Sequence, residues 1–250
     1  MSAIHGYGWN PQLPDHRDHN FSMLSGLALP PLVDLRDQDS PIEDQLALGS
    51  CTSFATGAAF RFDMRKQGLS DFVISHLFEY YNSRSKNSKG VDSGATIRGA
   101  IKAVNTYGLC PESEWPYDIA KFTSKPPTQS YKDALQDRAL KYQAVSQNLT
   151  VMKNCLAQGL PFVIGISVYE SFESQQVANT GMVPLLKNSD RLLGGHAVLI
   201  CGFRNSDMSF IFRNSWGVSW GDQGYGYLPY AYLLDSGLAS DFWVIQVVGK

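Results

Sequence analysis

The chain has 250 residues, of which 44% are hydrophobic and 18% are charged, and its formal net charge is −2. This length suffices for one large domain or two lobes whose core needs no disulfide staples. So small a net charge gives no attraction to nucleic acid or to anionic membranes, and no apolar run reaches the roughly 18 residues of a membrane span. We expect neither a signal peptide nor a transmembrane segment in these residues, which leaves the compartment open.

The first 30 residues differ from the rest, because they carry turn and extended signals without a helical or strand period. Between Asp15 and His19 the residue types would suit a metal ion, but nothing nearby completes a ligand set. We therefore expect a solvated loop there rather than a metal site. Pro30 and Pro31 mark the end of this segment.

A single cysteine, Cys51, follows Gly-Ser at the point where a helical pattern begins. Apolar residues then recur at the three- and four-residue spacing of a buried helix face, which leaves Arg61, Arg65 and Lys66 for solvent, and Gly68 ends the pattern. A thiol on the first turn of a helix faces unpaired N–H groups and the positive end of the dipole, and both favour the thiolate. The position of Cys51 thus indicates a reactive thiol.

A possible partner, His196, follows two glycines and opens an apolar, β-branched run, so we expect it at the mouth of a strand. A turn and a second short strand then lead to Asn214. A hairpin of this length would bring Asn214 beside His196, where the amide oxygen can accept the imidazole N–H and fix its tautomer. A histidine before a strand is usually a packing residue, but its order after Gln45 and Cys51 favours a catalytic one.

Four separated motifs in this order resemble those of the papain-like cysteine peptidases. They are Gln45 with Gly49-Ser50-Cys51 and Phe54-Ala55, Gly195-His196-Ala197, Asn214-Ser215-Trp216-Gly217, and Trp220-Gly221 with Gly224-Tyr225-Gly226-Tyr227. The Gly-Gly-His-Ala form is similar to that of the cathepsin-B-like branch and its bacterial relatives. The resemblance extends from about residue 33 to the C-terminus, so the chain is identified as a member of this family.

The resemblance implies an α+β, two-lobed papain-like fold, with the active site in the cleft between a helical N-terminal lobe and a β-barrel-like C-terminal lobe. We assign residues 1–30 to an extended, pro-like regulatory segment and residues 31–250 to the peptidase domain. Within that domain, about 31–140 form the helical lobe and about 141–250 the β-rich lobe. Hydrophobic spacing predicts helices over 75–82, over 97–104 and from 150 onward, and a strand over 161–169.

The resemblance also implies the catalytic roles. His196 takes the proton of Cys51, and Asn214 orients the imidazole, with Trp216 covering that hydrogen bond. The side-chain amide of Gln45 and the Cys51 backbone N–H stabilise the oxyanion, at about 3 kcal/mol per donor. No metal ion or cofactor is required, the substrate is a polypeptide, and we expect a monomer.

The type of activity is a further inference from the resemblance. A cathepsin-B-type exopeptidase would need a paired-histidine loop, whereas His76 is the only histidine between Cys51 and His196, so we favour an endopeptidase. Two alternatives stay open. The same side chains could serve a transamidase or deamidase, and the fold could serve a non-catalytic binding module.

By resemblance, the residues that contact substrate are Ser93, Gly94, Ala95, Gly165, Gly194, Gly195, Trp220 and Asp241. Ser93 and Gly94 stand where the backbone of an extended substrate pairs with the enzyme. The pocket for the substrate residue two before the scissile bond should be roomy, because its walls include Ala95, Gly165 and Gly194.

Asp241 aligns with the floor of that pocket, although a shift of one residue would place Ser240 or Phe242 there. A carboxylate at the floor would let the pocket accept arginine as well as bulky apolar side chains. The alternative is that Asp241 is a surface turn residue.

The four cysteines are Cys51, Cys110, Cys155 and Cys201. By resemblance, two positions that other family members join by a disulfide hold Leu48 and Val91 here. Cys155 lies on the apolar face of a predicted helix and Cys201 inside a predicted strand, so both are interpreted as core residues. We expect a disulfide-poor protein of bacterial type, compatible with a reducing compartment.

The N-terminal segment lacks the length and period of the helical pro-segment that zymogens of this family usually carry. Its apolar side chains need a surface to cover, and the substrate groove is the largest apolar concavity of such a fold. We therefore expect it to lie in the cleft and inhibit the enzyme, with Pro11 and Pro14 resisting cleavage over Cys51. Packing against the back of the two lobes is the alternative. The residues concerned are Tyr7, Trp9, Leu13, Pro14 and Phe21.

Overall fold

The computed structural model describes residues 6–136 and 141–246. Its helices are α1 (Cys51–Lys66), α2 (His76–Ser83), α3 (Ile97–Tyr107), α4 (Thr128–Ala134), α5 (Leu149–Ala157), α6 (Gln175–Thr180) and α7 (Tyr230–Leu234). Its strands are β1 (Leu32–Asp34), β2 (Lys141–Ala144), β3 (Phe162–Tyr169), β4 (Leu192–Arg204), β5 (Ser209–Arg213), β6 (Tyr225–Pro229) and β7 (Ala239–Gln246). This combination of helices and a large sheet confirms the α+β class. No helix in the described ranges is long and apolar enough to cross a membrane.

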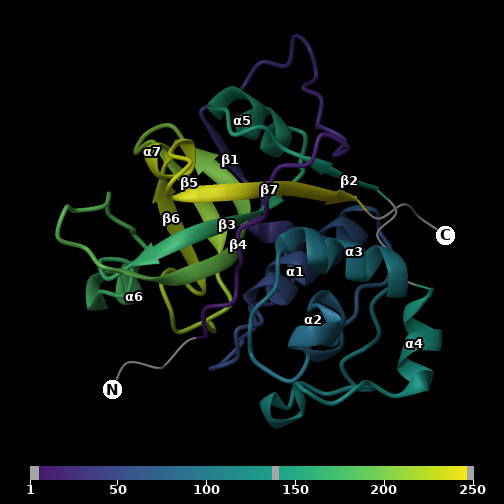
Figure 1. The fold of residues 1–250 in the computed structure, drawn as a ribbon. Helices are drawn as coiled ribbons and strands as arrows, with labels where there is room; N and C mark the ends of the chain where they lie inside the picture. The colour runs from purple at the N-terminus through teal and green to yellow at the C-terminus, as the bar shows by residue number, and fades with distance from the viewer. Residues whose placement is uncertain (1–5, 137–140, 247–250) are drawn as a thin grey trace.

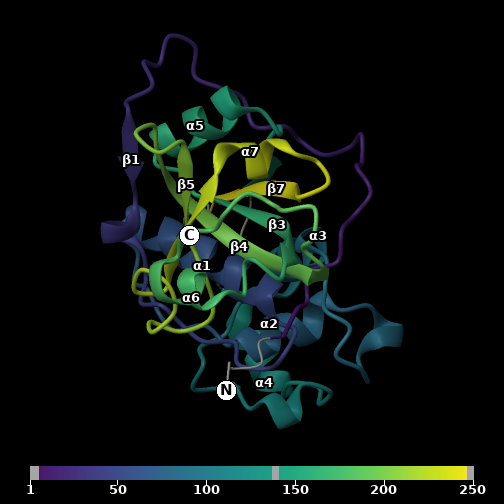
Figure 2. The same cartoon turned by 90° about the vertical axis from the view of Figure 1, so that its left-hand side faces the viewer.

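The strands form one antiparallel sheet in the order β2-β7-β3-β4-β5-β6, with β1 paired to β4. Figure 1 shows α1 to α4 gathered on one side of this sheet and α5 and α7 at its opposite end, and Figure 2 shows the same separation from the side. Because β1 joins the sheet, the range 31–140 does not belong wholly to the helical lobe. The boundary expected near residue 140 lies outside the described residues.

Helix α1 is buried along almost its whole length, from Cys51 to Met64, because the sheet packs on one side of it and α2 and α3 pack on the other. Small residues allow this close approach, since a Cβ on Gly57 would lie 2.1 Å from the side chain of Ile74. Arg61 is only 3% exposed, so its predicted exposure to solvent is wrong. Sequence spacing could not show that elements from both sides would enclose the helix.

Strand β4 begins at Leu192, four residues before His196. The two glycines before the histidine continue the ladder, with Gly194 opposite Val168 and Gly195 opposite Ser167. His196 therefore lies inside the strand. The expectation from the two glycines, that it lies at the mouth of the strand, is wrong.

The N-terminal segment has two parts. Trp9 forms a parallel bridge with Ala95, whereas Asn20 forms one with Ala144 at the edge of the sheet. Phe21 is 9% exposed and packs in the main hydrophobic core. In Figure 1 the purple trace of this segment passes across β4 and β7 before it reaches β2. The first part thus lies across the sheet near α1, and the second part is built into the domain.

Candidate active site

Cys51 is the first residue of α1, as the sequence predicts. Its thiol is fully buried, and burial raises the pKa of Cys51 to about 11, although backbone N–H groups that include those of Ala197 and Gly8 lower it. In the closed groove, the loss of water therefore opposes the effect of the helix N-terminus on the thiol. Gly8, one of the residues that bury the Cys51 thiol, belongs to the N-terminal segment.

His196 and Asn214 are brought together by the pairing of β4 with β5. Nε2 of His196 lies 2.8 Å from Oδ1 of Asn214, and both side chains are buried. The ring of Trp216 lies over the imidazole, with 4.9 Å between the ring centroids. Since Nε2 faces the amide oxygen, Nδ1 is the nitrogen left to exchange a proton with a thiol.

The side chain of Gln45 is held with its amide nitrogen directed at the cleft. Its Oε1 accepts a hydrogen bond of 2.6 Å from Ser215 Oγ, and its Nε2 donates to the backbone oxygens of Leu48 at 2.9 Å and Gly6 at 2.8 Å. The bond to Ser215 fixes which end of the amide faces outward. The outward N–H already holds a peptide carbonyl, that of Gly6.

The segment from Gly6 to Gln12 is bonded to both walls of the cleft. On the helical side, Ala95 N donates to Gly8 O at 2.7 Å, and Asn10 N donates to Ala95 O at 3.0 Å. On the sheet side, Trp9 N donates to Gly195 O at 3.0 Å. These are the contacts of an added β-strand, so the segment occupies the groove as a bound peptide would.

The indole of Trp9 fills a pocket between the two walls and is 6% exposed. A Cβ on Gly165 would lie 1.9 Å from the indole, so a glycine is needed there. At the far end of the pocket, Asp241 Oδ2 accepts hydrogen bonds from Trp9 Nε1 at 3.0 Å and from the Gln12 backbone at 3.2 Å. Burial raises the pKa of Asp241 to about 6 against these two hydrogen bonds.

Comparison with known proteins agrees with this geometry. The model of the papain family of cysteine proteases matches residues 29–241. The chain belongs to the papain family of cysteine proteases. It is thus a hydrolase of peptide bonds and a cysteine endopeptidase, and the identification made from the sequence motifs is confirmed. In the described ranges, no group of three His, Cys, Asp or Glu side chains could hold a metal ion.

Individual relatives of this papain-family chain span viruses, protists and bacteria. An uncharacterized peptidase C1-like protein of Acanthamoeba polyphaga mimivirus is 44% identical over 215 residues, which cover 82% of this chain and 69% of that protein. A cathepsin B-like protein of Giardia intestinalis is 28% identical over 79% of this chain and 67% of that protein. The crystal structure of xylellain, a cysteine protease from Xylella fastidiosa, has a TM-score of 0.88 at 40% identity and covers 99% of this chain and 98% of that one.

The structure brings most of the predicted substrate-contact residues of this protease to the groove, with three differences. Ala95 is the residue that exchanges backbone hydrogen bonds with the segment, whereas Ser93 O accepts from the Asn10 side chain at 2.8 Å and Gly94 packs against Gly8. Gly194 lies against Tyr7 rather than against Trp9. The remaining difference concerns Trp220, which is 6% exposed and packs against Trp216 and Phe172, as a core residue does.

Two residues near the catalytic groups escaped the sequence analysis. Ser215 lies inside the Asn-Ser-Trp-Gly motif, yet its contact with Gln45 depends on two segments 170 residues apart. Glu43 lies two residues before Gln45 and is ion-paired with buried Arg61. Its place so close to the Gln45 motif was the signal that could have indicated a role for Glu43. Its partners, however, are distant in sequence.

Proposed function

We propose that this endopeptidase uses Cys51 as its nucleophile and His196 as the base that takes the thiol proton. The thiolate attacks the scissile carbonyl carbon, and the oxygen takes up negative charge facing Gln45 Nε2 and the Cys51 backbone N–H. The imidazolium then gives its proton to the leaving amine as the C–N bond breaks. Water hydrolyses the thioester and restores the thiol. Asn214 keeps the imidazole in one orientation throughout.

One observation carries this proposal: the Gln45 amide donates a hydrogen bond of 2.8 Å to a peptide carbonyl, that of Gly6. The segment that contains this carbonyl is also hydrogen-bonded to Ala95 and Gly195 in the groove. An oxyanion donor must be aimed in advance at the place where the charge develops. The bond from Ser215 to the other end of the amide supplies that aim.

We also propose that residues 6–12 inhibit the enzyme in place of a helical pro-segment. Their direction supports this. In a substrate, the residue in the pocket precedes the scissile carbonyl in sequence. In the segment, Trp9 fills the pocket, and the carbonyl at Gln45 belongs to Gly6, which comes three residues earlier. The segment therefore runs in the reverse direction to a substrate.

Resistance to cleavage would then come from this reversed direction rather than from proline. Gly6 and Gly8 are the residues next to Gln45 and Cys51, whereas Pro11 and Pro14 come after the pocket residue. Both glycines are packed against backbone, since a Cβ on Gly8 would lie 1.8 Å from Gly49 O and one on Gly6 would lie 2.4 Å from Leu48 C. That Pro11 and Pro14 stiffen the segment stays an expectation.

The pocket itself supports a preference at the substrate residue two before the scissile bond. We propose that Asp241 selects side chains that carry both apolar bulk and a hydrogen-bond donor, as the Trp9 indole does, and arginine as the charged equivalent. The Asp241→Ala variant should lower the ratio of arginine to phenylalanine turnover. An unchanged ratio would remove Asp241 from the specificity site.

A substitution in the full chain tests whether the segment inhibits the enzyme. Trp9→Ala removes the indole from its pocket, which should weaken docking of the segment by about 3 kcal/mol and raise the accessible fraction about 100-fold. Hydrolysis of small peptides and labelling of Cys51 by an epoxide inhibitor should rise together. The control is Leu13→Ala, because that side chain is 85% exposed and its loss should change neither rate.

The outcomes separate inhibition by the segment from the role of Cys51 as the nucleophile. Equal rates in Trp9→Ala and the parent would reject inhibition by the segment. Full hydrolysis in Trp9→Ala combined with Cys51→Ala, or labelling at another cysteine, would reject Cys51 as the nucleophile. Deletion should stop at residue 12, because Phe21 is part of the core and loss of residues 1–30 would disturb folding.

A further inference from the structure

Glu43 is a buried acid that the proposed chemistry does not use. Its side chain is 17% exposed and faces three cationic or donor groups. Oε1 lies 3.2 Å from Nε2 of His76, while Oε2 lies 3.3 Å from Nη1 of Arg61 and 3.5 Å from Nη2 of Arg213. These partners lower the pKa of Glu43 to about 2 against the effect of burial.

The three partners come from different parts of the fold. Arg61 belongs to α1, the helix that begins at Cys51, and His76 begins α2. Arg213 ends β5 on the other side of the cleft, directly before Asn214. Both arginine side chains are at most 5% exposed. One carboxylate therefore joins the helical lobe to the sheet beneath the active site.

Backbone contacts link Glu43 to the catalytic residues. Gly217 N donates to Glu43 O at 3.3 Å, and Gln45 N donates to Ser215 O at 2.9 Å. Asp44 forms an antiparallel bridge with Trp216. Residues 43–45 and 215–217 thus form a short ladder that carries the Gln45 side chain at one end and the Glu43 carboxylate at the other.

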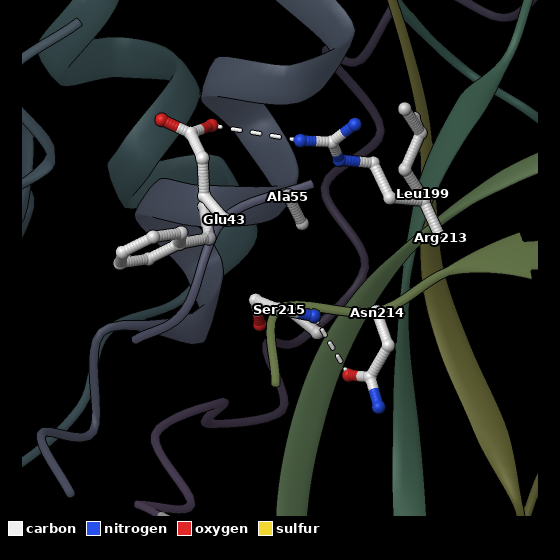
Figure 3. A pocket seen from close by; sticks show the side chains of 8 residues that line it. Glu43, Ala55, Leu199, Arg213, Asn214 and Ser215 are labelled. Atoms are coloured by element: carbon white, nitrogen blue, oxygen red, sulfur yellow. Dashed lines mark hydrogen bonds and ion pairs between the residues drawn. The ribbon is translucent and has the colours of Figure 1, made fainter. Parts of the chain in front are cut away.

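The space between these groups is small. Figure 3 shows Glu43 and Arg213 paired on one side and Asn214 and Ser215 on the other. The cavity that they line with Ala55 and Leu199 has a volume of about 10 Å³, room for a single water. A shift of the carboxylate would therefore be passed on to the ladder rather than absorbed by empty space.

We propose that Glu43 is a positioning residue for catalysis, because its carboxylate fixes the ladder of residues 43–45 and 215–217 and so aims the Gln45 amide at the oxyanion. This inference rests on the proposed role of Gln45. A neutral amide at position 43 has one acceptor atom, so it cannot serve all three partners, and its NH₂ would face a donor. The ladder would then lose its anchor to both lobes.

The experiment compares Glu43→Gln with Asp71→Asn in full chains that also carry Trp9→Ala. Asp71 is a matched control: it is 14% exposed, pairs with the same Arg61 at 2.8 Å, and makes no described contact with Arg213 or the ladder. Glu43→Gln should lower kcat about 10-fold with KM within 2-fold, and Asp71→Asn should leave kcat within 2-fold. If Glu43→Gln does not fold, Glu43→Asp takes its place with the same expectation, because the shorter side chain cannot reach partners in both lobes.

A double substitution separates positioning from general damage. In a Gln45→Ala background, Glu43→Gln should lower kcat by less than 2-fold, because the group that it aims is gone. Independent losses that multiply would overturn the inference, as would equal losses in Glu43→Gln and Asp71→Asn, or none in either.

A second measurement does not depend on activity. Backbone amide exchange at Gln45 and Gly217 should be at least 10-fold faster in Glu43→Gln than in Asp71→Asn, and equal exchange would overturn the inference. A Trp9→Ala parent that hydrolyses no peptide would count against the proposed function instead. The exchange result would then decide the role of Glu43.

Discussion

Replacing Gly8 by alanine should open the active site without removing any side chain. A Cβ at this position would lie 1.8 Å from Gly49 O and 2.3 Å from Gly49 C, both backbone atoms. Contacts of this kind need about 3 Å, so the two backbones must separate by more than 1 Å. No side-chain rotation can relieve the clash, and the segment must leave its place in the groove.

The cost follows from the hydrogen bonds that end there. Ala95 N to Gly8 O is 2.7 Å and Trp9 N to Gly195 O is 3.0 Å. Losing both at about 1 kcal/mol each weakens docking by about 2 kcal/mol, which is about a 30-fold change in the accessible fraction. The rate of Cys51 labelling by an epoxide inhibitor should rise by that factor.

The control is Gly90→Ala, because a Cβ on Gly90 has nothing within 4 Å. Both variants should keep the parent melting temperature to within a few degrees, since Phe21 and the rest of the core are untouched. A Gly8→Ala protein that folds and is labelled at the parent rate would refute the reasoning. The segment would then not be docked as described.

Three further predictions concern single side chains. Ser215→Ala removes the bond that orients Gln45 and should lower kcat about 5- to 10-fold with KM little changed, as steady-state kinetics would show. Burial in the closed groove raises the pKa of Asp241 to about 6, so closure takes up a proton and docking should weaken as pH rises from about 4 to above 6. The labelling rate of Cys51 should therefore rise over this pH range in the parent, and Asp241→Asn should abolish that dependence. Burial raises the pKa of Glu79 well above its ordinary value, so the folded state loses stability as pH rises above the ordinary glutamate range; urea unfolding of Glu79→Gln should show higher stability than the parent at pH 8 and little difference at pH 4.

The sequence by itself determined the family and the class of fold, and it predicted the residues that we propose for catalysis. These depend on local signals: a helix that starts at Cys51, a hairpin that returns Asn214 to the strand of His196, and a glutamine six residues before the cysteine. Side-chain spacing of this kind follows from the periods of helix and strand, so a single chain can show it. The structure has the helix start and the pairing where the sequence placed them.

Only the tertiary structure decided what surrounds these residues. It placed Trp9 on Asp241, covered the Cys51 thiol so that burial raises its pKa, and buried Arg61 against Glu43. Each of these depends on segments far apart in the chain, where burial and desolvation outweigh local preference. The direction of the N-terminal segment was also decided only by the tertiary structure. It depends on hydrogen bonds to Ala95 on one wall of the groove and to Gly195 on the other, which the sequence of the segment does not show.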